Sequence, residues 1–134
     1  MGEVRITARL TNAADEGLFR RGLLAADQVR RYEANAVVVD TGATRTVLPP
    51  EIAEHLGLAI RVRRFVRYAD GHREEVSVTE PLVVEIDGQD TIDDALVLGD
   101  QVLIGQTVLE KLNLLVDCDG GRLIPNPRQP ASRV

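Results

Sequence analysis

The chain has 134 residues, of which 44% are hydrophobic and 28% are charged, and this length and composition indicate one globular domain rather than a disordered chain. The formal net charge is −5 and the only aromatic residues are two Tyr and two Phe, which argues against nucleic-acid modules that need a basic surface or stacking rings. A single cysteine, Cys118, excludes an internal disulfide and a cysteine-based zinc cluster.

The sequence contains no recognisable targeting or membrane-spanning segment. Charged residues interrupt the apolar residues near the N-terminus, and no apolar run approaches the ~20 residues that a membrane-spanning helix needs. A free cysteine is typical of a reducing compartment. We therefore expect a cytoplasmic protein without nucleic-acid or membrane partners.

The first predicted elements are two strands separated by a long connection. Residues 4–10 alternate between apolar and polar side chains, which predicts a half-buried strand. Residues 12–31 are polar and predict a connection, with a short helix around residues 24–31. Residues 36–39 (AVVV) form an apolar, largely β-branched run that is typical of a strand buried on both faces, and this run ends at Asp40.

A short helix and a series of β-hairpins follow. The two prolines at residues 49–50 predict the start of the helix, and Gly57 predicts its end. Residues 59–99 are rich in β-branched side chains and predict a β-meander. Two Asp-Gly pairs, at residues 70–71 and 87–88, are strong signals for two-residue turns within it.

The last part of the chain repeats this alternation of short elements. Residues 103–105 (LIG) lead into a second predicted short helix, and a strand at residues 114–116 and a turn at residues 119–121 follow. Residues 126–134 form a Pro-rich tail. We therefore expect a single domain over residues 1–125.

The feature most indicative of chemistry is Asp-Thr-Gly at residues 40–42, directly after the predicted buried strand. A carboxylate at the end of such a strand is held rigidly at the edge of the core. Thr41 can hydrogen-bond backbone groups around the turn, and Gly42 allows a close approach of two backbone segments. The alternative is a solvated Asp in an ordinary turn, and these three residues alone leave both interpretations open.

The segment Val37–Leu48 (VVVDTGATRTVL) resembles the active-site segment of the retropepsin-like aspartic proteases. The resemblance continues in order and spacing over roughly residues 36–125. Its further parts are residues 66–78 in the place of the flap hairpin, residues 82–88 and 95–99 as the following strands, and residues 102–112 (VLIGQTVLEKL) as the hydrophobic-hydrophobic-Gly motif and its helix.

The resemblance is closest to small single-domain members from bacteria and archaea, which share the helix after the active site and an ending like residues 121–125 (GRLIP). It implies an all-β fold, namely a small closed β-barrel of the retropepsin type with one or two short helices. It also implies an aspartic endopeptidase that acts on a peptide or protein substrate and needs no metal or cofactor.

Aspartic proteolysis uses two carboxylates that share one proton. One carboxylate acts as the general base on a water molecule, and the protonated one donates a hydrogen bond to the scissile carbonyl. This chain contains one Asp-Thr-Gly, so the resemblance implies a homodimer in which Asp40 of each subunit forms the dyad. The further roles that the resemblance implies are support of the catalytic loop by Thr41 and Gly42, substrate binding by Ala43, Ala69, Asp70 and Gly71, and support of the loop from behind by Gly105.

The sequence departs from the retroviral members at two places. Thr44 and Gln106 stand where those proteins carry an Asp and an Arg, so a hydrogen bond could replace an ion pair. The flap tip reads Tyr-Ala-Asp-Gly-His at residues 68–72 and is not glycine-rich. The unusual flap favours a catalytically silent dimerisation or peptide-binding module, whereas the intact Asp-Thr-Gly-Ala favours the enzyme.

The remaining charged residues leave two interpretations open. Five arginines lie between residues 61 and 73, and nine acidic residues without a basic one follow in residues 74–100. The flap could attract acidic peptides, or the charges could pair across strands of one sheet, which is the more common case. His55 and His72 are expected at the surface, and residues 117–121 are expected to form a turn rather than a calcium loop.

Overall fold

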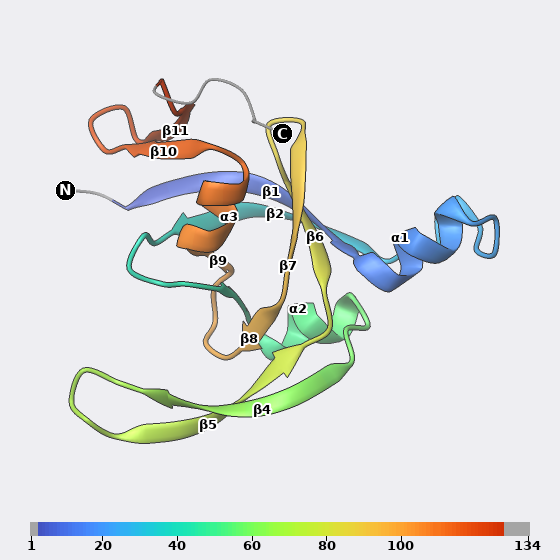
Figure 1. Cartoon of the computed structure of the whole chain (residues 1–134), viewed down its shortest axis with the longest axis horizontal. Helices are drawn as coiled ribbons and strands as arrows, with labels where there is room; N and C mark the ends of the chain where they lie inside the picture. Colours follow the sequence, from blue (N-terminus) through green and yellow to red (C-terminus); the bar gives the residue numbers. More distant parts are fainter. Residues whose placement is uncertain (1–2, 128–134) are drawn as a thin grey trace.

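The computed structural model describes residues 3–127, and β-strands are its main secondary structure (Figure 1). The strands are β1 (Val4–Asn12), β2 (Arg31–Val39), β3 (Thr46–Leu48), β4 (Ile60–Arg67), β5 (Arg73–Thr79), β6 (Leu82–Ile86), β7 (Gln89–Asp93), β8 (Ala95–Val97), β9 (Leu103–Ile104), β10 (Leu114–Asp117) and β11 (Arg122–Pro125). The helices are α1 (Ala13–Arg20), the 3-10 helix η1 (Ala26–Gln28), α2 (Pro50–His55) and α3 (Gln106–Lys111).

Nine strands form one sheet in the order β4-β5-β8-β3-β9-β2-β1-β6-β7, and β10 and β11 form a separate pair. The mostly-β class is confirmed, but the predicted closed barrel is wrong for the described residues, because β4 and β7 are the two edges of an open sheet. β5 pairs with β4 along its length but with β8 only through Ser77 and Val78, so residues 73–76 have β4 as their one neighbouring strand. The β4–β5 hairpin therefore projects from the body instead of closing the sheet (Figure 1).

The core is aliphatic, as the aromatic-poor composition predicts. Val37 of β2 and Ile104 of β9 lie on neighbouring parallel strands, and both are fully buried. Leu48 at the end of β3 and Leu109 of α3 are buried in the same cluster. Burial of such side chains stabilises each by roughly 1.5–3 kcal/mol. Because these four side chains pack together, the ends of β2 and β3 and the helix α3 are fixed relative to one another.

The two predicted short helices are confirmed. α2 begins with Pro50 at its first position and is followed by Gly57, whose φ of 62° is the left-handed conformation that ends many helices. α3 buries Val108 and Leu109 on one side, and Asn113 follows it with a φ of 60°.

The short helix predicted around residues 24–31 is confirmed only in part. The structure has α1 at residues 13–20, and only the short η1 falls within the predicted range. Asn12 explains the start of α1, because its side-chain oxygen accepts a hydrogen bond from the Asp15 N–H at 3.0 Å. The side chain of Arg30 binds both carboxylate oxygens of the buried Asp15, at 2.8 and 2.9 Å, and holds the pKa of Asp15 below its usual range. These contacts tie the two ends of the connection together.

The predicted meander is only partly correct. The Asp-Gly pair at residues 87–88 forms the expected two-residue turn of the β6–β7 hairpin. The pair at residues 70–71 also lies at a hairpin tip, but the loop there is longer, because the Tyr68 N–H bonds to the His72 carbonyl and residues 69–71 lie between them. β5 and β6, however, are not neighbours, since β5 pairs with β8 and β6 pairs with β1. The chain turns away after Thr79, where Glu80 donates its N–H to Ala59 and Pro81 accepts from Ala13. β6 thereby enters the buried interior beside β1.

The C-terminal part agrees with the prediction as far as the structure describes it. β10 and β11 form a hairpin, and the turn between them is held by the carboxylate of Asp117, which accepts from the Gly120 N–H at 3.0 Å. Residues 128–134 of the predicted tail lie outside the described residues, and the domain boundary stays a prediction. Over residues 3–127, no helix has the length and apolar character needed to cross a membrane.

Candidate active site

Asp40 lies where β2 leaves the core. β2 runs parallel to β9, with Val38 opposite Leu103 and Val39 opposite Ile104. Asp40 continues this pairing by donating its N–H to the Ile104 carbonyl at 3.0 Å. The buried apolar run of β2 therefore delivers Asp40 to the surface at a position that the sheet fixes. Residues 40–45, which connect β2 to β3, are called the Asp40 loop below.

The carboxylate of Asp40 is held by its own loop. Its Oδ1 accepts a hydrogen bond from the Gly42 N–H at 2.9 Å, and its carbonyl accepts from the Ala43 N–H at 3.2 Å. A Cβ at position 42 would lie 3.2 Å from Oδ1, which is close contact. Asp40 and Thr41 are both exposed in the single chain. One carboxylate oxygen is thus anchored on the loop while the side chain remains open to solvent.

Gly105 and the start of α3 lie directly behind the Asp40 loop. A Cβ at position 105 would lie 2.6 Å from the Ala43 carbonyl oxygen and 2.8 Å from the Arg45 carbonyl oxygen, which is closer than real side chains approach. The Gln106 N–H also donates to the Ala43 carbonyl at 2.7 Å, and the Thr107 N–H donates to Thr44 at 3.1 Å. Only glycine therefore fits at position 105, because any larger side chain would displace the backbone of the Asp40 loop.

The replacement suggested for the missing ion pair takes another form. The side-chain amide of Gln106 donates to Glu110 at 3.3 Å, within α3. The link between position 106 and the Asp40 loop runs instead through the backbone of Gln106 and Ala43. Backbone hydrogen bonds do not depend on side-chain identity, which explains how the loop keeps its connection to α3 without an Arg.

The far end of the Asp40 loop is fixed by a buried carboxylate that the sequence analysis did not assign to the site. Asp93, 7% exposed, accepts hydrogen bonds from the Thr46 N–H at 3.1 Å and the Thr46 hydroxyl at 2.8 Å. Its neighbour Asp94 lies 3.3 Å from Arg45 in an ion pair. Asp93 is 47 positions from Thr46, and no local pattern connects the two residues.

The tip of the β4–β5 hairpin contains Ala69, Asp70 and Gly71, the other residues predicted to bind substrate. The Tyr68 N–H donates to the His72 carbonyl at 2.9 Å, and the rings of these two residues stack with centroids 4.4 Å apart. Asp70 accepts from the His72 N–H at 3.0 Å and contacts the His72 ring at 2.6 Å. These bonds, the backbone bond first, hold the pKa of Asp70 below its usual range.

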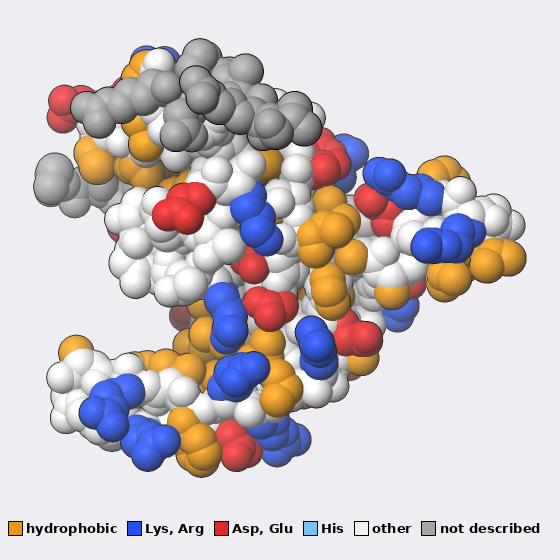
Figure 2. Space-filling view, viewed as in Figure 1, with side chains coloured by type: hydrophobic (Ala, Val, Ile, Leu, Met, Phe, Trp, Pro, Cys, Tyr) orange, Lys and Arg blue, Asp and Glu red, His pale blue; other side chains and the backbone are white. Residues whose placement is uncertain are grey.

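The Asp40 loop and the hairpin tip lie at the same end of the molecule. In Figure 1 the loop after β2 points toward the side to which the β4–β5 hairpin projects. Figure 2 shows a hollow between this hairpin and the rest of the body. The hollow has the open form of a cleft with the hairpin as one wall.

His55 and Cys118, which the sequence analysis also noted, lie outside this cleft. His55 contacts the Arg31 carbonyl at 3.2 Å and the Tyr32 ring edge-on, and Cys118 is exposed. Over residues 3–127 no cluster of three or more His, Cys, Asp and Glu side chains is suited to hold a metal ion.

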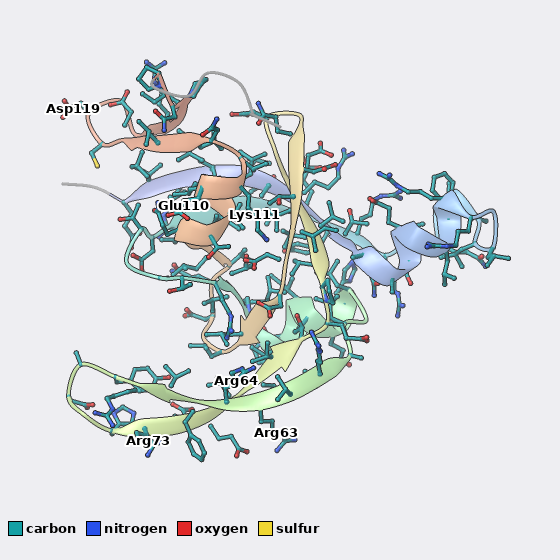
Figure 3. The ribbon with its side chains drawn as sticks, viewed as in Figure 1. Arg63, Arg64, Arg73, Glu110, Lys111 and Asp119 are labelled. Carbon is teal, nitrogen blue, oxygen red and sulfur yellow. The ribbon has the colours of Figure 1, made fainter. Side chains whose placement is uncertain are left out.

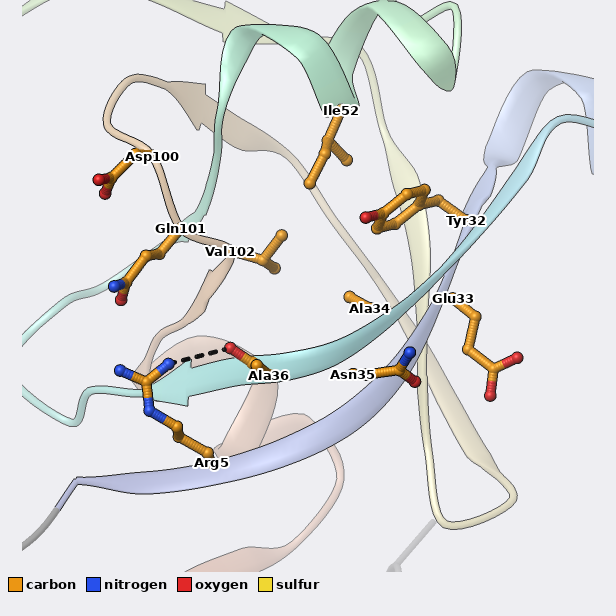
Figure 4. A pocket seen from close by; sticks show the side chains of 10 residues that line it. All are labelled: Arg5, Tyr32, Glu33, Ala34, Asn35, Ala36, Ile52, Asp100, Gln101 and Val102. Carbon is orange, nitrogen blue, oxygen red and sulfur yellow. Dashed lines mark hydrogen bonds between the residues drawn. The ribbon is translucent and has the colours of Figure 1, made fainter.

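A separate pocket of about 350 Å³ lies on the flank of β2 (Figure 4). Apolar side chains from Ile52 and Val102 line part of it, with Asp100 and Arg5 at its polar side. Arg5 is occupied by Glu3 at 2.6 Å and by the Ala36 carbonyl at 3.4 Å. The lining includes neither the Asp40 loop nor the hairpin tip, so this pocket is distinct from the cleft.

Comparison with known families identifies a match over the candidate site. The model of the family described as gag-polyprotein putative aspartyl protease matches residues 30–111. This range is more than half of the chain and includes β2, the Asp40 loop, the β4–β5 hairpin, β9 and α3. No curated protein matches the chain.

Proposed function

The chain belongs to the family of gag-polyprotein putative aspartyl proteases, and on this basis we propose that it is an aspartic endopeptidase that works as a homodimer. The observation that carries the proposal is the geometry of Asp40. Its exposed carboxylate stands at the end of a buried strand, is anchored by the Gly42 N–H, and belongs to a loop that α3 supports through the backbone.

In the proposed mechanism, Asp40 of each subunit contributes one carboxylate to a pair that shares a proton. Two carboxylates about 3 Å apart cannot both ionise, because their charges repel, so one is charged and one is protonated. The charged one takes a proton from water as the oxygen attacks the scissile carbonyl carbon, and the protonated one donates a hydrogen bond to the carbonyl oxygen. The tetrahedral intermediate then collapses, the C–N bond breaks, and the leaving amine takes a proton from the dyad.

The dimer is proposed because one chain supplies half of this chemistry. In a two-fold interface the same surface of both subunits meets at the axis. Asp40 and Thr41 are exposed in the single chain, as residues must be if a second copy is to cover them. We expect Thr41 to donate a hydrogen bond across the axis, with Gly42 and Gly105 shaping the loop on each side.

The proposed substrate is a peptide or protein segment bound in the cleft under the β4–β5 hairpin. Ala43 on the Asp40 loop and Ala69, Asp70 and Gly71 at the hairpin tip are proposed to contact it. No metal or cofactor enters this mechanism. A cytoplasmic location and a kinship with small bacterial and archaeal members are further parts of the proposal, the first supported by the exposed free thiol of Cys118.

Replacement of Asp40 tests the proposal. Asp40→Asn keeps the shape of the side chain but cannot act as a general base, so we expect cleavage of a peptide library, followed by mass spectrometry, to fall to background. Sedimentation should show that the variant remains a dimer. Asp27→Asn, which changes an exposed carboxylate on η1, is the matched control and should cleave like the natural protein. Cleavage by Asp40→Asn, or a natural protein that stays monomeric while it cleaves, would contradict the proposal.

The second candidate is a catalytically silent dimerisation or peptide-binding module of the same fold. It is favoured by the hairpin tip, where the Asp70–His72 and Tyr68–His72 contacts hold a turn without a glycine-rich sequence. This candidate predicts a purified natural protein that binds peptides but cleaves none of them.

A further inference from the structure

The two faces of the β4–β5 hairpin point in different directions. Cross-strand pairing places Val62, Arg64 and Val66 on one face, opposite Val78, Val76 and Glu74 of β5. On this face Val76 and Val78 are 5% and 2% exposed, so it is the inner face, turned toward the body. Figure 3 shows Arg64 on the side of the body and Arg63 and Arg73 on the side away from it. Arg64 therefore lies in the wall of the cleft.

Two arginines on the outer face, Arg63 and Arg73, have partners within the hairpin. Arg63 Nη1 lies 3.5 Å from Glu75 Oε1. The two residues form a diagonal pair on this face, because Arg63 is directly opposite Ser77 and Glu75 is two residues before it. The guanidinium of Arg73 lies over the ring of Phe65, 4.9 Å from its centroid. The Arg63–Glu75 pair agrees with the interpretation that charges pair across strands of one sheet.

Arg64 on the inner face has no such match. Its side chain is exposed, and none of the carboxylates of residues 3–127 forms an ion pair with it. The other charged residue on this face, Glu74, pairs with Val66 in the register and accepts a hydrogen bond from the Tyr68 hydroxyl at 3.0 Å. Glu74 is thus held toward the hairpin tip, and the positive charge of Arg64 remains available to a ligand.

The hairpin also differs in charge from the rest of the molecule. Residues 60–79 carry five arginines and three acidic residues, in a chain whose net charge is −5. An acidic peptide is repelled by a negatively charged surface and attracted to a positive region on it. The hairpin is therefore a part of the chain that favours an acidic ligand.

From these observations, and resting on the proposed function, we infer that Arg64 is a specificity-determining residue that selects substrates with a Glu or Asp side chain. The planar guanidinium binds a carboxylate through two parallel hydrogen bonds. Alternate residues of an extended peptide project from the same face at roughly 6.5–7 Å, the same spacing as Val62, Arg64 and Val66 on β4. A bound peptide strand would accordingly place an acidic side chain at Arg64 and apolar side chains at the two valines.

The test is cleavage of matched peptides in which Glu, Gln or Lys is placed in turn at each position around the scissile bond. For the natural protein we expect one position where Glu is favoured over Gln by about tenfold in kcat/KM, mainly through KM, and where Lys is disfavoured. High salt should reduce this preference. Arg64→Gln should abolish it, and Arg64→Glu should reverse it in favour of Lys.

Arg63→Gln is the matched control, because it removes the same charge one residue away on the outer face. It should keep the preference within about twofold of the natural protein. Equal cleavage of Glu and Gln peptides at every position, or equal effects of the Arg63 and Arg64 variants, overturns the inference and leaves the proposed function intact.

Binding separates failure of the inference from failure of the proposed function. The affinity of the same peptides, carrying a fluorescent label, is measured by anisotropy on the natural protein and on Arg64→Gln. If no peptide is cleaved, the proposed function fails. Tighter binding of Glu than Gln peptides, lost in Arg64→Gln, then still supports the inference, whereas equal binding or no binding overturns it.

Discussion

The Asp40 loop and the tip of the β4–β5 hairpin are both short turns on the same cleft, but different contacts hold them. The Asp40 loop is fixed by backbone hydrogen bonds to β9 and α3 and by the close approach of Gly105. The hairpin tip has backbone hydrogen bonds only within its own turn, and the side chains of Asp70, Tyr68 and His72 add the other contacts that hold it. The proposed chemistry would thus lie on a loop fixed to the core of the chain, and the proposed substrate selection on a projecting hairpin.

The largest effect is expected where an added atom would meet the backbone of the Asp40 loop. In Gly105→Ala the new methyl group collides with the carbonyl oxygens of Ala43 and Arg45. We expect a loss of about 1–3 kcal/mol in the free energy of unfolding, measured with urea, and a larger proportional loss of cleavage because the loop must shift.

Gly17→Ala is the control for this substitution. Gly17 lies in α1, where the new methyl group would meet only the end of the flexible Arg21 side chain at 3.2 Å. Alanine favours the helix, so stability should be unchanged or slightly higher and cleavage unaffected. If Gly105→Ala behaves like Gly17→Ala, the Asp40 loop is not fixed by the backbone in the way described.

At the other end of the loop, where the Asp93 side chain bonds Thr46, we expect a similar loss of stability but a smaller loss of cleavage. Asp93→Ala leaves the buried Thr46 N–H and hydroxyl without their acceptor, which costs about 1–3 kcal/mol in the free energy of unfolding. Asp94→Asn is the matched neighbour, since its ion pair with Arg45 is half-exposed and worth at most about 1 kcal/mol. Equal urea midpoints for the two variants would show that Asp93 has no special part in fixing the loop.

These two ends also show what the sequence could predict. The Asp40 loop follows from a local pattern, because a buried apolar run, Asp-Thr-Gly, and a later Leu-Ile-Gly are each readable by themselves. The Asp-Gly turns and the helix that starts at Pro50 are local for the same reason. The contact between Asp93 and Thr46 depends on which strands meet, and no local pattern records that.

Strand order was the main limit of the sequence analysis. The predicted meander requires β5 to pair with β6, but β6 pairs with β1, and β5 pairs with β8 instead. Leu82, Val83 and Val84 are all buried, so β6 gains more from the interior than from an edge position. The missed helix α1 has a different cause: Asn12 is a good helix cap followed by acidic residues, and the polar character of residues 12–31 concealed this signal.

The smallest effect is expected at the hairpin tip. Asp70→Ala removes the acceptor of the His72 N–H and ring, but both residues are exposed and far from the core, so the urea midpoint should not change measurably. Amide hydrogen exchange at residues 71 and 72 should become faster, because the tip loses the bond that orders it. Since the backbone N–H of His72 is the first cause of the lowered pKa of Asp70, His72→Gln should speed exchange less than Asp70→Ala does.

The pH dependence of exchange at the tip has a definite sign. The folded pKa of Asp70 is lower than its value in an unfolded chain, so the bond is fully present above that unfolded value, about 3.9, and is lost as pH falls through the lower folded pKa. After correction for intrinsic exchange, protection of residue 72 should be constant from pH 7 to about 5 and should fall only in stronger acid. In Asp70→Ala this acid step should be missing. If the acid step is unchanged in Asp70→Ala, a group other than Asp70 holds the tip. The contrast between a backbone-held Asp40 loop and a tip held by its own side chains would then fail.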